Sequence, residues 1–268
     1  MKRFILSLGL GLLAGYSAKA ADYCFIAAEN YKVIKQAGDN CSLRQAPCST
    51  FKIALSLMGY NEGILKDETH PEFPFKKGYV DWLERWKQPH NPQLWMKNSC
   101  VWYSQVLTKK LGMKKYKEYA VKFNYGNADV SGDKGKNNGL SRAWLSSSLQ
   151  ISPEEQIKFL QKLIDYKLPV SKKANEMTRK ILFVEKLADG WKLYGKTGNG
   201  SQQRADGSKI KDRQVGWFVG WISKGKRHIV FVYRILDKNK QNTYASLRAK
   251  AAARKELLKI IREQSGKQ

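Results

Sequence analysis

The sequence is poor in acidic residues and in histidine. It has 49 lysines and arginines against 23 aspartates and glutamates, a formal net charge of +26 over 268 residues. The three histidines, His70, His90 and His228, are too few and too scattered for a zinc site, and no Cys-x-x-Cys pair occurs, so we expect no metal centre. Beyond the first twenty residues no apolar run reaches the roughly 18 residues that span a bilayer. The sequence therefore predicts a soluble mature chain without a metal.

The excess of basic residues is compatible with nucleic acid, a membrane surface or small anions as partners. The basic residues are scattered along the whole chain, and dense patches such as Lys109-Lys110 and Lys172-Lys173 are never longer than two. No helix-turn-helix, RNP or zinc-finger pattern accompanies them. We therefore interpret the charge as a solvated cationic surface and expect no nucleic-acid partner.

The first twenty residues have the pattern of a secretory signal. Lys2 and Arg3 precede an apolar stretch at 4–14, and Ala18-Lys19-Ala20 offers small residues where a signal peptidase cleaves. We expect cleavage after Ala20 and export to the periplasm. A single domain then occupies 21–268.

Export to an oxidising compartment makes disulfides possible for the four cysteines. Cys41 and Cys48 lie seven residues apart, so a bond between them would close a small loop directly before Ser49. We predict that disulfide. Cys24 and Cys100 are expected to be buried as small apolar residues.

The hydrophobic pattern changes along the chain from strands to helices and back to strands. Apolar residues at helical spacing follow Ser49, and Ser152-Pro153-Glu154-Glu155 is a helix start with a capping serine. The predicted elements are a strand pair from 24 to 33, a helix at 50–58, strands at 191–194, 215–222 and 229–234, and a final helix at 244–263. The polar stretch from 199 to 214 is expected to be a mobile loop. This order favours an α+β fold, with a sheet subdomain from about 21–50 and 185–268 and a helical subdomain at about 51–184.

Ser49-Thr50-Phe51-Lys52 is a Ser-x-x-Lys tetrad. On a helix the first and fourth positions share a face, so the lysine amine can reach the serine hydroxyl. Backbone N–H groups at the helix N-terminus can stabilise a developing oxyanion. A tetrad with two fixed positions arises by chance in many chains, so further motifs have to support it.

Two further motifs follow in the order that this chemistry needs. Ser99-Cys100-Val101 lies 50 residues after Ser49, and Lys196-Thr197-Gly198 lies 147 residues after it, next to a predicted strand. A strand-borne Lys-Thr can hold a carboxylate, and the adjacent glycine lets the backbone approach a ligand. The three motifs in this order are the signature of serine β-lactamases and penicillin-binding proteins.

With Tyr125-Gly126-Asn127 and Trp144-Leu145 added, the chain resembles the class D, oxacillinase-type, β-lactamases from about Phe25 to the final helix. The resemblance implies an antiparallel sheet flanked by helices, beside an all-α subdomain, with the active site at their junction. It also implies hydrolysis of β-lactams through an acyl-enzyme on Ser49, without a bound cofactor. Lys52 would be carboxylated by carbon dioxide, from dissolved bicarbonate, and would act as the general base.

The resemblance implies further roles. Ser99 and Lys196 would deliver the proton to the leaving nitrogen, and the backbone N–H groups of Ser49 and Asn199 would form the oxyanion hole. Trp144 would hydrogen-bond the carbamate while apolar neighbours keep Lys52 uncharged. The remaining expected residues are Val101, Thr197, Gly198 and Arg248 for substrate binding, Leu145 in the pocket, and Tyr125 and Asn127 at its border or in a purely structural role.

One departure and two alternatives stay open. Asn199 replaces the aromatic residue that the family often has after the Lys-Thr-Gly, so the rim of the pocket and the preferred substrates, which depend on loops near Asn199 and Trp95, are not predicted. A β-lactam sensor or a cell-wall transpeptidase would share Ser49, Lys52 and Lys196 but would stay acylated or transfer the acyl group. The sequence does not predict an oligomeric state.

Overall fold

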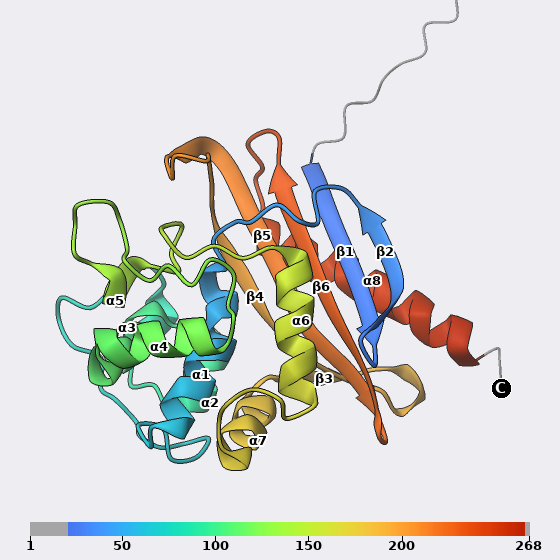
Figure 1. Cartoon of the computed structure of the whole chain (residues 1–268), viewed down its shortest axis with the longest axis horizontal. Coiled ribbons are helices and arrows are strands. Elements are labelled where there is room, and N and C mark those ends of the chain that lie inside the picture. The colour runs from blue at the N-terminus through green and yellow to red at the C-terminus, as the bar shows by residue number, and fades with distance from the viewer. Residues whose placement is uncertain (1–20, 266–268) are drawn as a thin grey trace, which may run out of the picture.

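A six-stranded antiparallel sheet forms the centre of the molecule in a computed structural model that describes residues 21–265 (Figure 1). The strands are ordered β2-β1-β6-β5-β4-β3, so both ends of the chain contribute neighbouring strands. Their bounds are β1 Ala21–Glu29, β2 Lys32–Gly38, β3 Phe183–Lys186, β4 Lys192–Gln203, β5 Lys209–Lys224 and β6 Arg227–Asp237. The predicted α+β class is confirmed.

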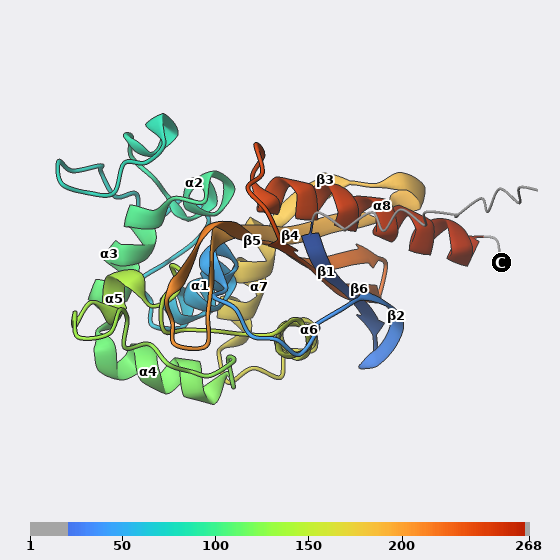
Figure 2. The same cartoon turned by 90° about the horizontal axis from the view of Figure 1, so that it is seen from above.

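Helices cover both faces of this sheet, as the view from above shows (Figure 2). The last helix, α8, lies across one face, and α1, α6 and α7 lie on the other, with α2 to α5 beside them (Figures 1 and 2). The helices are α1 Lys52–Asn61, α2 Pro92–Asn98, α3 Val101–Leu111, α4 Met113–Lys122, α5 Gly139–Arg142, α6 Pro153–Ile164, α7 Lys172–Ile181 and α8 Ala245–Ser265, with short 3₁₀ turns η1 Cys48–Phe51, η2 Glu84–Trp86 and η3 Ala188–Gly190.

Alternation along the strands gives the sheet a core on each face. Phe218 of β5 and Phe231 of β6 pack with Leu257 of α8, whereas Trp217 and Trp221 of β5 belong to the core on the helical side. The two tryptophans therefore serve core packing. All five side chains are almost wholly buried.

Several local predictions from the sequence are confirmed. β1 and β2 form a hairpin, β5 and β6 another, and the final helix begins one residue later than predicted. The Ser152 side chain accepts from the Glu155 N–H, and the Glu155 carboxylate accepts from the Ser152 N–H, which is the predicted capping box.

The polar stretch from 199 to 214 was expected to be a loop, and this is wrong. β4 continues to Gln203 and β5 begins at Lys209, with Gly200 opposite Val215 and Ser201 opposite Gln214. Polar side chains are tolerated here because the hairpin extends beyond the packed part of the sheet and is largely exposed. The five residues 204–208 make the turn.

The predicted disulfide between Cys41 and Cys48 is also wrong. Cys24 bonds Cys41 instead, with a Cα–Cα distance of 5.3 Å, and Cys48 is a free, buried thiol. Pairing of β1 with β2 sets Cys24 opposite Gly38, and the chain leaving β2 then returns Cys41 to the strand on which Cys24 lies. Cys100 is free and buried, as predicted, whereas Cys24 is not free.

Within residues 21–265 no helix is both long enough and apolar enough to cross a membrane. The predicted signal peptide lies outside the residues that the structure describes.

Candidate active site

The Ser49 tetrad lies in a turn that leads directly into α1. Residues Cys48–Phe51 form the 3₁₀ turn η1, and α1 continues from Lys52, so Ser49 is at the helix N-terminus as predicted. The Lys52 Nζ donates a hydrogen bond to the Ser49 Oγ over 3.2 Å. Ser49 is half-buried, so a base is in contact with a hydroxyl that remains accessible.

Burial changes the protonation of Lys52. The side chain is only 1% exposed, and desolvation lowers its pKa from 10.5 to about 8. At pH 7.5 roughly a quarter of such amines are neutral, against about 0.1% for a free lysine. Lys52 therefore has the chemistry of a base, and of an amine that can react with carbon dioxide.

Two buried thiols interact electrostatically with Lys52. Burial raises the pKa of Cys48 to about 12 and that of Cys100 to about 11, so both stay neutral near pH 7. A neutral thiol leaves the lysine without a counter-ion. No carboxylate forms an ion pair with Lys52 within the described chain.

Strand β4 passes directly against the Ser49 turn. A Cβ on Gly198 would lie 2.7 Å from the carbonyl oxygen of Pro47 and 3.0 Å from Thr50 Cγ2, so only glycine fits. The Trp217 Nε1 of the neighbouring strand donates to the Ala46 carbonyl over 3.0 Å and fixes the approach to the turn. The structure therefore brings the Lys-Thr-Gly and Ser-x-x-Lys motifs together.

Lys196 is the second buried amine at this junction. Its side chain is buried, and its Nζ donates to the Thr197 carbonyl at 3.1 Å and the Thr197 hydroxyl at 3.4 Å. Desolvation, and then repulsion from Lys52, lower the pKa of Lys196 well below its usual value. The lowered pKa favours the neutral amine, and a substrate anion bound beside it would favour the protonated, charged form.

The backbone of β4 beyond β3 has one free edge. β3 pairs only with residues 192–194 of β4, so from Lys196 onward β5 is the single neighbouring strand. No strand covers the other edge there, and the N–H groups of Ser201 and Gln203 donate to the side chains of Ser146 and Gln45. The Asn199 side chain instead accepts from the Ser246 N–H at 3.0 Å and donates to Gln214, which ties β4 to the start of α8.

Ser99 joins α2 to α3 and is half-buried. Its φ of 57° is left-handed, and Cys48, directly before Ser49, has a φ of 51°. Each such non-glycine conformation costs on the order of 1 kcal/mol and often marks a functional site. Val101, the first residue of α3, is buried beside the same core.

Trp144 has an unused hydrogen-bond donor. Its ring stacks on that of Phe51, the residue before Lys52, with centroids 5.9 Å apart, and its Nε1 is buried without an acceptor. A buried N–H without a partner costs about 1–3 kcal/mol. The orphaned donor fits an anionic group carried by a residue near Phe51, which is what a carboxylated Lys52 would provide. Leu145 follows and is half-buried.

Tyr125 and Asn127 shape the surrounding loops. Tyr125 is fully buried, and its ring meets those of Phe51 and Phe159 edge-on. Asn127 donates to the Ser148 carbonyl and accepts from the Gln150 N–H. Of the two roles left open for these residues, the contacts favour the structural one.

Arg248 makes a strong contact within the protein. Its Nη2 donates to both carboxylate oxygens of Asp237, at 2.9 and 2.7 Å, and the Asp237 side chain is wholly buried. The guanidinium predicted to bind a substrate carboxylate thus already holds one. Trp95, expected near a substrate loop, is fully buried and donates to Ser104.

Two further residues contribute to the site and were not predicted from the sequence. Ser146 accepts from the Ser201 N–H at 3.0 Å and so docks the loop after Trp144 onto β4. Lys250 of α8 lies near enough to Lys196 to lower the pKa of that amine. Ser146 follows the Trp144-Leu145 motif directly, which was a usable signal, whereas nothing in the sequence marks Lys250.

Comparisons with known proteins agree with this geometry. Residues 25–259 match the family model of the penicillin-binding protein transpeptidase domain. The chain is 43% identical over 203 residues to β-lactamase OXA-9 of Klebsiella pneumoniae, covering 75% of this chain and 74% of that protein. It is 40% identical over 251 residues to β-lactamase OXA-1 of Escherichia coli, covering 92% and 88%.

The solved structure of the class D β-lactamase OXA-427 superposes with a TM-score of 0.83 at 46% identity, covering 91% of this chain and 99% of that one. The fold and the paired serine and lysine define a serine acyl-transferring protein of the penicillin-binding type. The chain belongs to the class D β-lactamases.

Proposed function

We propose that this class D β-lactamase hydrolyses β-lactams through an acyl-enzyme on Ser49, with Lys52 as the residue that carries the general base. The observation that carries the proposal is the 3.2 Å hydrogen bond between Ser49 and a buried lysine that lacks a counter-ion. The reaction needs no resident cofactor beyond carbon dioxide.

Lys52 and Trp144 would hold that carbon dioxide. Bound as a carbamate, it supplies an anionic oxygen base where the free amine is mostly protonated at neutral pH. The lowered pKa of Lys52 supports its formation, and the unpaired Trp144 Nε1 supports its retention.

The chain's own residues then have separate tasks. Ser49 gives up its proton toward Lys52 and attacks the β-lactam carbonyl carbon, and the N–H groups of Ser49 and Asn199 stabilise the resulting oxyanion. Ser99 and Lys196 pass a proton to the nitrogen that leaves. A water activated on the Lys52 side then hydrolyses the ester and regenerates Ser49.

Substrate binding rests on the carboxylate that most β-lactams carry. Lys196 and Thr197 lie at the end of the site where that group would be held, with Gly198, Val101 and Leu145 as neighbours. Arg248 acts there only if its Asp237 contact is shared or released. The predicted signal peptide would deliver the enzyme to the periplasm.

Intact-protein mass spectrometry during turnover of oxacillin tests this function. We expect a transient adduct on Ser49 that appears within the mixing time and disappears when substrate is exhausted, and no adduct in Ser49→Ala. The match to the transpeptidase family favours one alternative, a penicillin-binding protein that acylates and stays acylated. An adduct that persists after the free drug is removed would establish that alternative and sink the hydrolase.

A further inference from the structure

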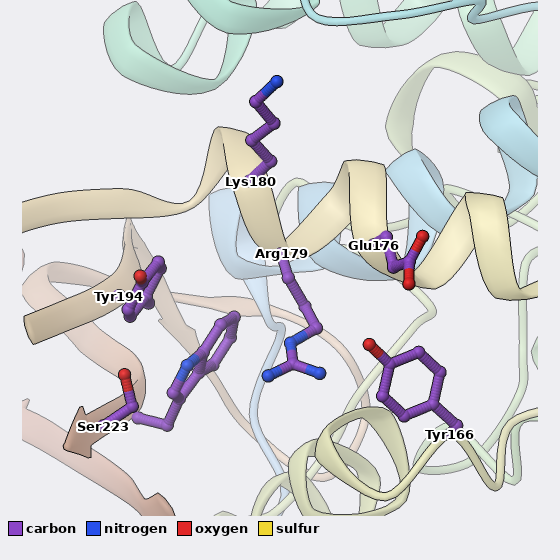
Figure 3. A pocket seen from close by; sticks show the side chains of 7 residues that line it. Tyr166, Glu176, Arg179, Lys180, Tyr194 and Ser223 are labelled. Atoms are coloured by element: carbon purple, nitrogen blue, oxygen red, sulfur yellow. The ribbon is translucent and has the colours of Figure 1, made fainter. Parts of the chain in front are cut away.

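A cavity of about 240 Å³ opens on the helical side of the sheet, between α7 and the strands β4 and β5 (Figure 3). The stacked rings of Tyr194 and Trp221 line it together with Tyr166, Arg179 and Ser223. None of the residues that carry the proposed reaction lines it. It is therefore a separate feature of the molecule.

Arg179 is the unusual group in this cavity. Its guanidinium carbon lies 5.3 Å from the centroid of the Tyr166 ring and 6.0 Å from that of Trp221. Within residues 21–265 no hydrogen bond or ion pair engages its side chain. Arginine forms bidentate hydrogen bonds with carboxylates and phosphates, and here that capacity is unused.

The other charged residues of the cavity have partners elsewhere. Glu176 pairs with Lys172 at 3.8 Å, and Lys180 pairs with Glu68. In Figure 3 the Lys180 side chain points away from the cavity, whereas the Arg179 guanidinium points into the space between Tyr194 and Tyr166. Within residues 21–265, Arg179 is therefore the charged residue of the lining that has no ion-pair partner.

The lining includes a flat aromatic surface, and a histidine lies next to one lining residue on the neighbouring strand. Tyr194 and Trp221 are stacked, with centroids 5.1 Å apart and an interplanar angle of 6°. His228 is the cross-strand partner of Ser223, and its Nδ1 is buried without a hydrogen-bond partner. Burial and the nearby charge of Arg179 lower the pKa of His228, which Asp165 partly opposes. His228 therefore senses the charge at Arg179.

We propose that this cavity binds a small oxyanion, a carboxylate or a phosphate, whose charged end pairs with Arg179 and whose remaining atoms lie against Tyr194 and Trp221. The site would act beside the hydrolase centre, because Tyr194 lies two residues before Lys196 on β4.

Nuclear magnetic resonance of the His228 ring tests the site, with its signal assigned by His228→Gln. Inorganic phosphate and benzoate are titrated separately into the mature protein. We expect a saturable shift and a higher His228 pKa with at least one anion, because the anion offsets the charge of Arg179. A response to phosphate alone identifies a phosphate site, and a response to benzoate alone identifies a site for planar carboxylates.

Arg179→Gln should weaken the binding by roughly tenfold or more, and Arg179→Lys should recover part of it. Turnover of a chromogenic cephalosporin by both variants reports that they remain folded. Absence of any saturable shift in the wild-type protein, or an equal response in Arg179→Gln, would overturn the site.

A separate observation concerns the carboxylate end of the active site, and it rests on the proposed hydrolase function. Arg248 is turned toward the end of β6 by Asp237, whereas Lys250 faces the other side of α8. Its Nζ lies 5.9 Å from the centroid of Phe218, the residue directly opposite Thr197 in the sheet. Within the described chain no ion pair engages Lys250.

We infer that Lys250, rather than Arg248, is the cation of α8 that attracts the substrate carboxylate toward Lys196 and Thr197. The start of α8 is fixed beside β4 by the bond from the Ser246 N–H to Asn199, and Ser246 and Lys250 lie one helical turn apart on one face.

Steady-state kinetics with a penicillin and with its methyl ester separate this role from general folding effects. Lys250→Ala should raise KM for the acid roughly three- to tenfold, with kcat and the constants for the ester little changed, and Lys250→Arg should restore the affinity. An unchanged KM for the acid, or equal losses for acid and ester, would contradict the inference. The wild-type turnover measured in the same series tests the hydrolase function independently.

Discussion

The two sides of the sheet differ in whether their buried charged side chains form ion pairs. On the α8 side the core is aromatic and aliphatic, and Asp237, the one fully buried carboxylate among residues 21–265, is paired with Arg248. On the helical side Lys52, Lys196 and Arg234 are each at most 5% exposed, and no ion pair engages them within the described chain. The Arg234 Nη1 and Nη2 donate to the carbonyls of Leu43 and Asn40, whereas its buried Nε has no hydrogen-bond partner. The two lysines beside Ser49 lack an anion.

This difference indicates which side of the sheet carries stability and which carries function. A fully buried aliphatic or aromatic side chain contributes roughly 1.5–3 kcal/mol, whereas an unpaired buried charge is destabilising. The site therefore depends on the opposite face for its support. The unpaired Lys52 and Lys196 are compatible with the two anions of the proposed function, a carbamate and the substrate carboxylate.

The largest effect is expected when the base is removed. Lys52→Met should lower kcat/KM for a chromogenic cephalosporin by roughly a thousandfold or more, because Ser49 loses the group that accepts its proton. Lys162→Met, an exchange on the outer part of α6, serves as the matched control. Normal turnover by Lys52→Met would contradict the mechanism.

The α8 face should respond in stability and not in catalysis. Leu257→Ala should lower the free energy of unfolding by about 2–5 kcal/mol, because Leu257 is fully buried in that core. Denaturant unfolding measures the loss, and kcat of the folded fraction should stay near the wild-type value. A large fall in kcat would mean that packing on the α8 face also affects catalysis on the helical face.

The disulfide gives the next effect. Replacing Cys24 and Cys41 by serine should cost about 3 kcal/mol, since the bond closes a loop of 17 residues. Cys48→Ala is the matched control, because it keeps the disulfide. A reducing agent should lower the stability of Cys48→Ala and of the wild type by the same amount. If Cys48→Ala lowered the stability as much as replacement of Cys41 does, the Cys41–Cys48 disulfide predicted from the sequence would be correct after all.

Burial of the Lys52 amine should make the free energy of unfolding depend on pH. Its pKa is about 8 in the folded protein and 10.5 when unfolded, so between these values the unfolded chain binds more protons and stability rises with pH. In degassed buffer Lys52→Met should therefore be more stable than wild type at pH 7, by up to about 3 kcal/mol, with the difference fading toward pH 10. Parallel stability curves for the two proteins would contradict the buried, unpaired amine.

Local features of the fold could be predicted, and long-range ones could not. The capping box at Ser152, the Ser49 helix start and the strand-borne Lys196 depend on neighbouring residues, and the structure confirms them. The disulfide failed because sequence distance suggested Cys48, whereas the β1–β2 hairpin decides which cysteine returns to Cys24.

The same limit applies to the site. The motifs predict roles for the serine, the two lysines and Trp144, since each motif spans no more than four residues. That Asp237 holds Arg248 follows from the end of β6 meeting the first turn of α8, and no local pattern encodes it. The hairpin at 199–214 was not predicted, because its strands are polar and extend beyond the packed sheet. They therefore lack the hydrophobic pattern by which a strand is recognised.

The account depends on the state of Lys52. The most direct measurement is a ¹³C nuclear magnetic resonance spectrum of the mature protein in ¹³C-bicarbonate, recorded alongside turnover of oxacillin before and after degassing at mildly acid pH. We predict a carbamate resonance that is absent in Lys52→Met, and turnover that falls on degassing and returns with bicarbonate in step with that resonance. Full turnover without a carbamate resonance would contradict the account.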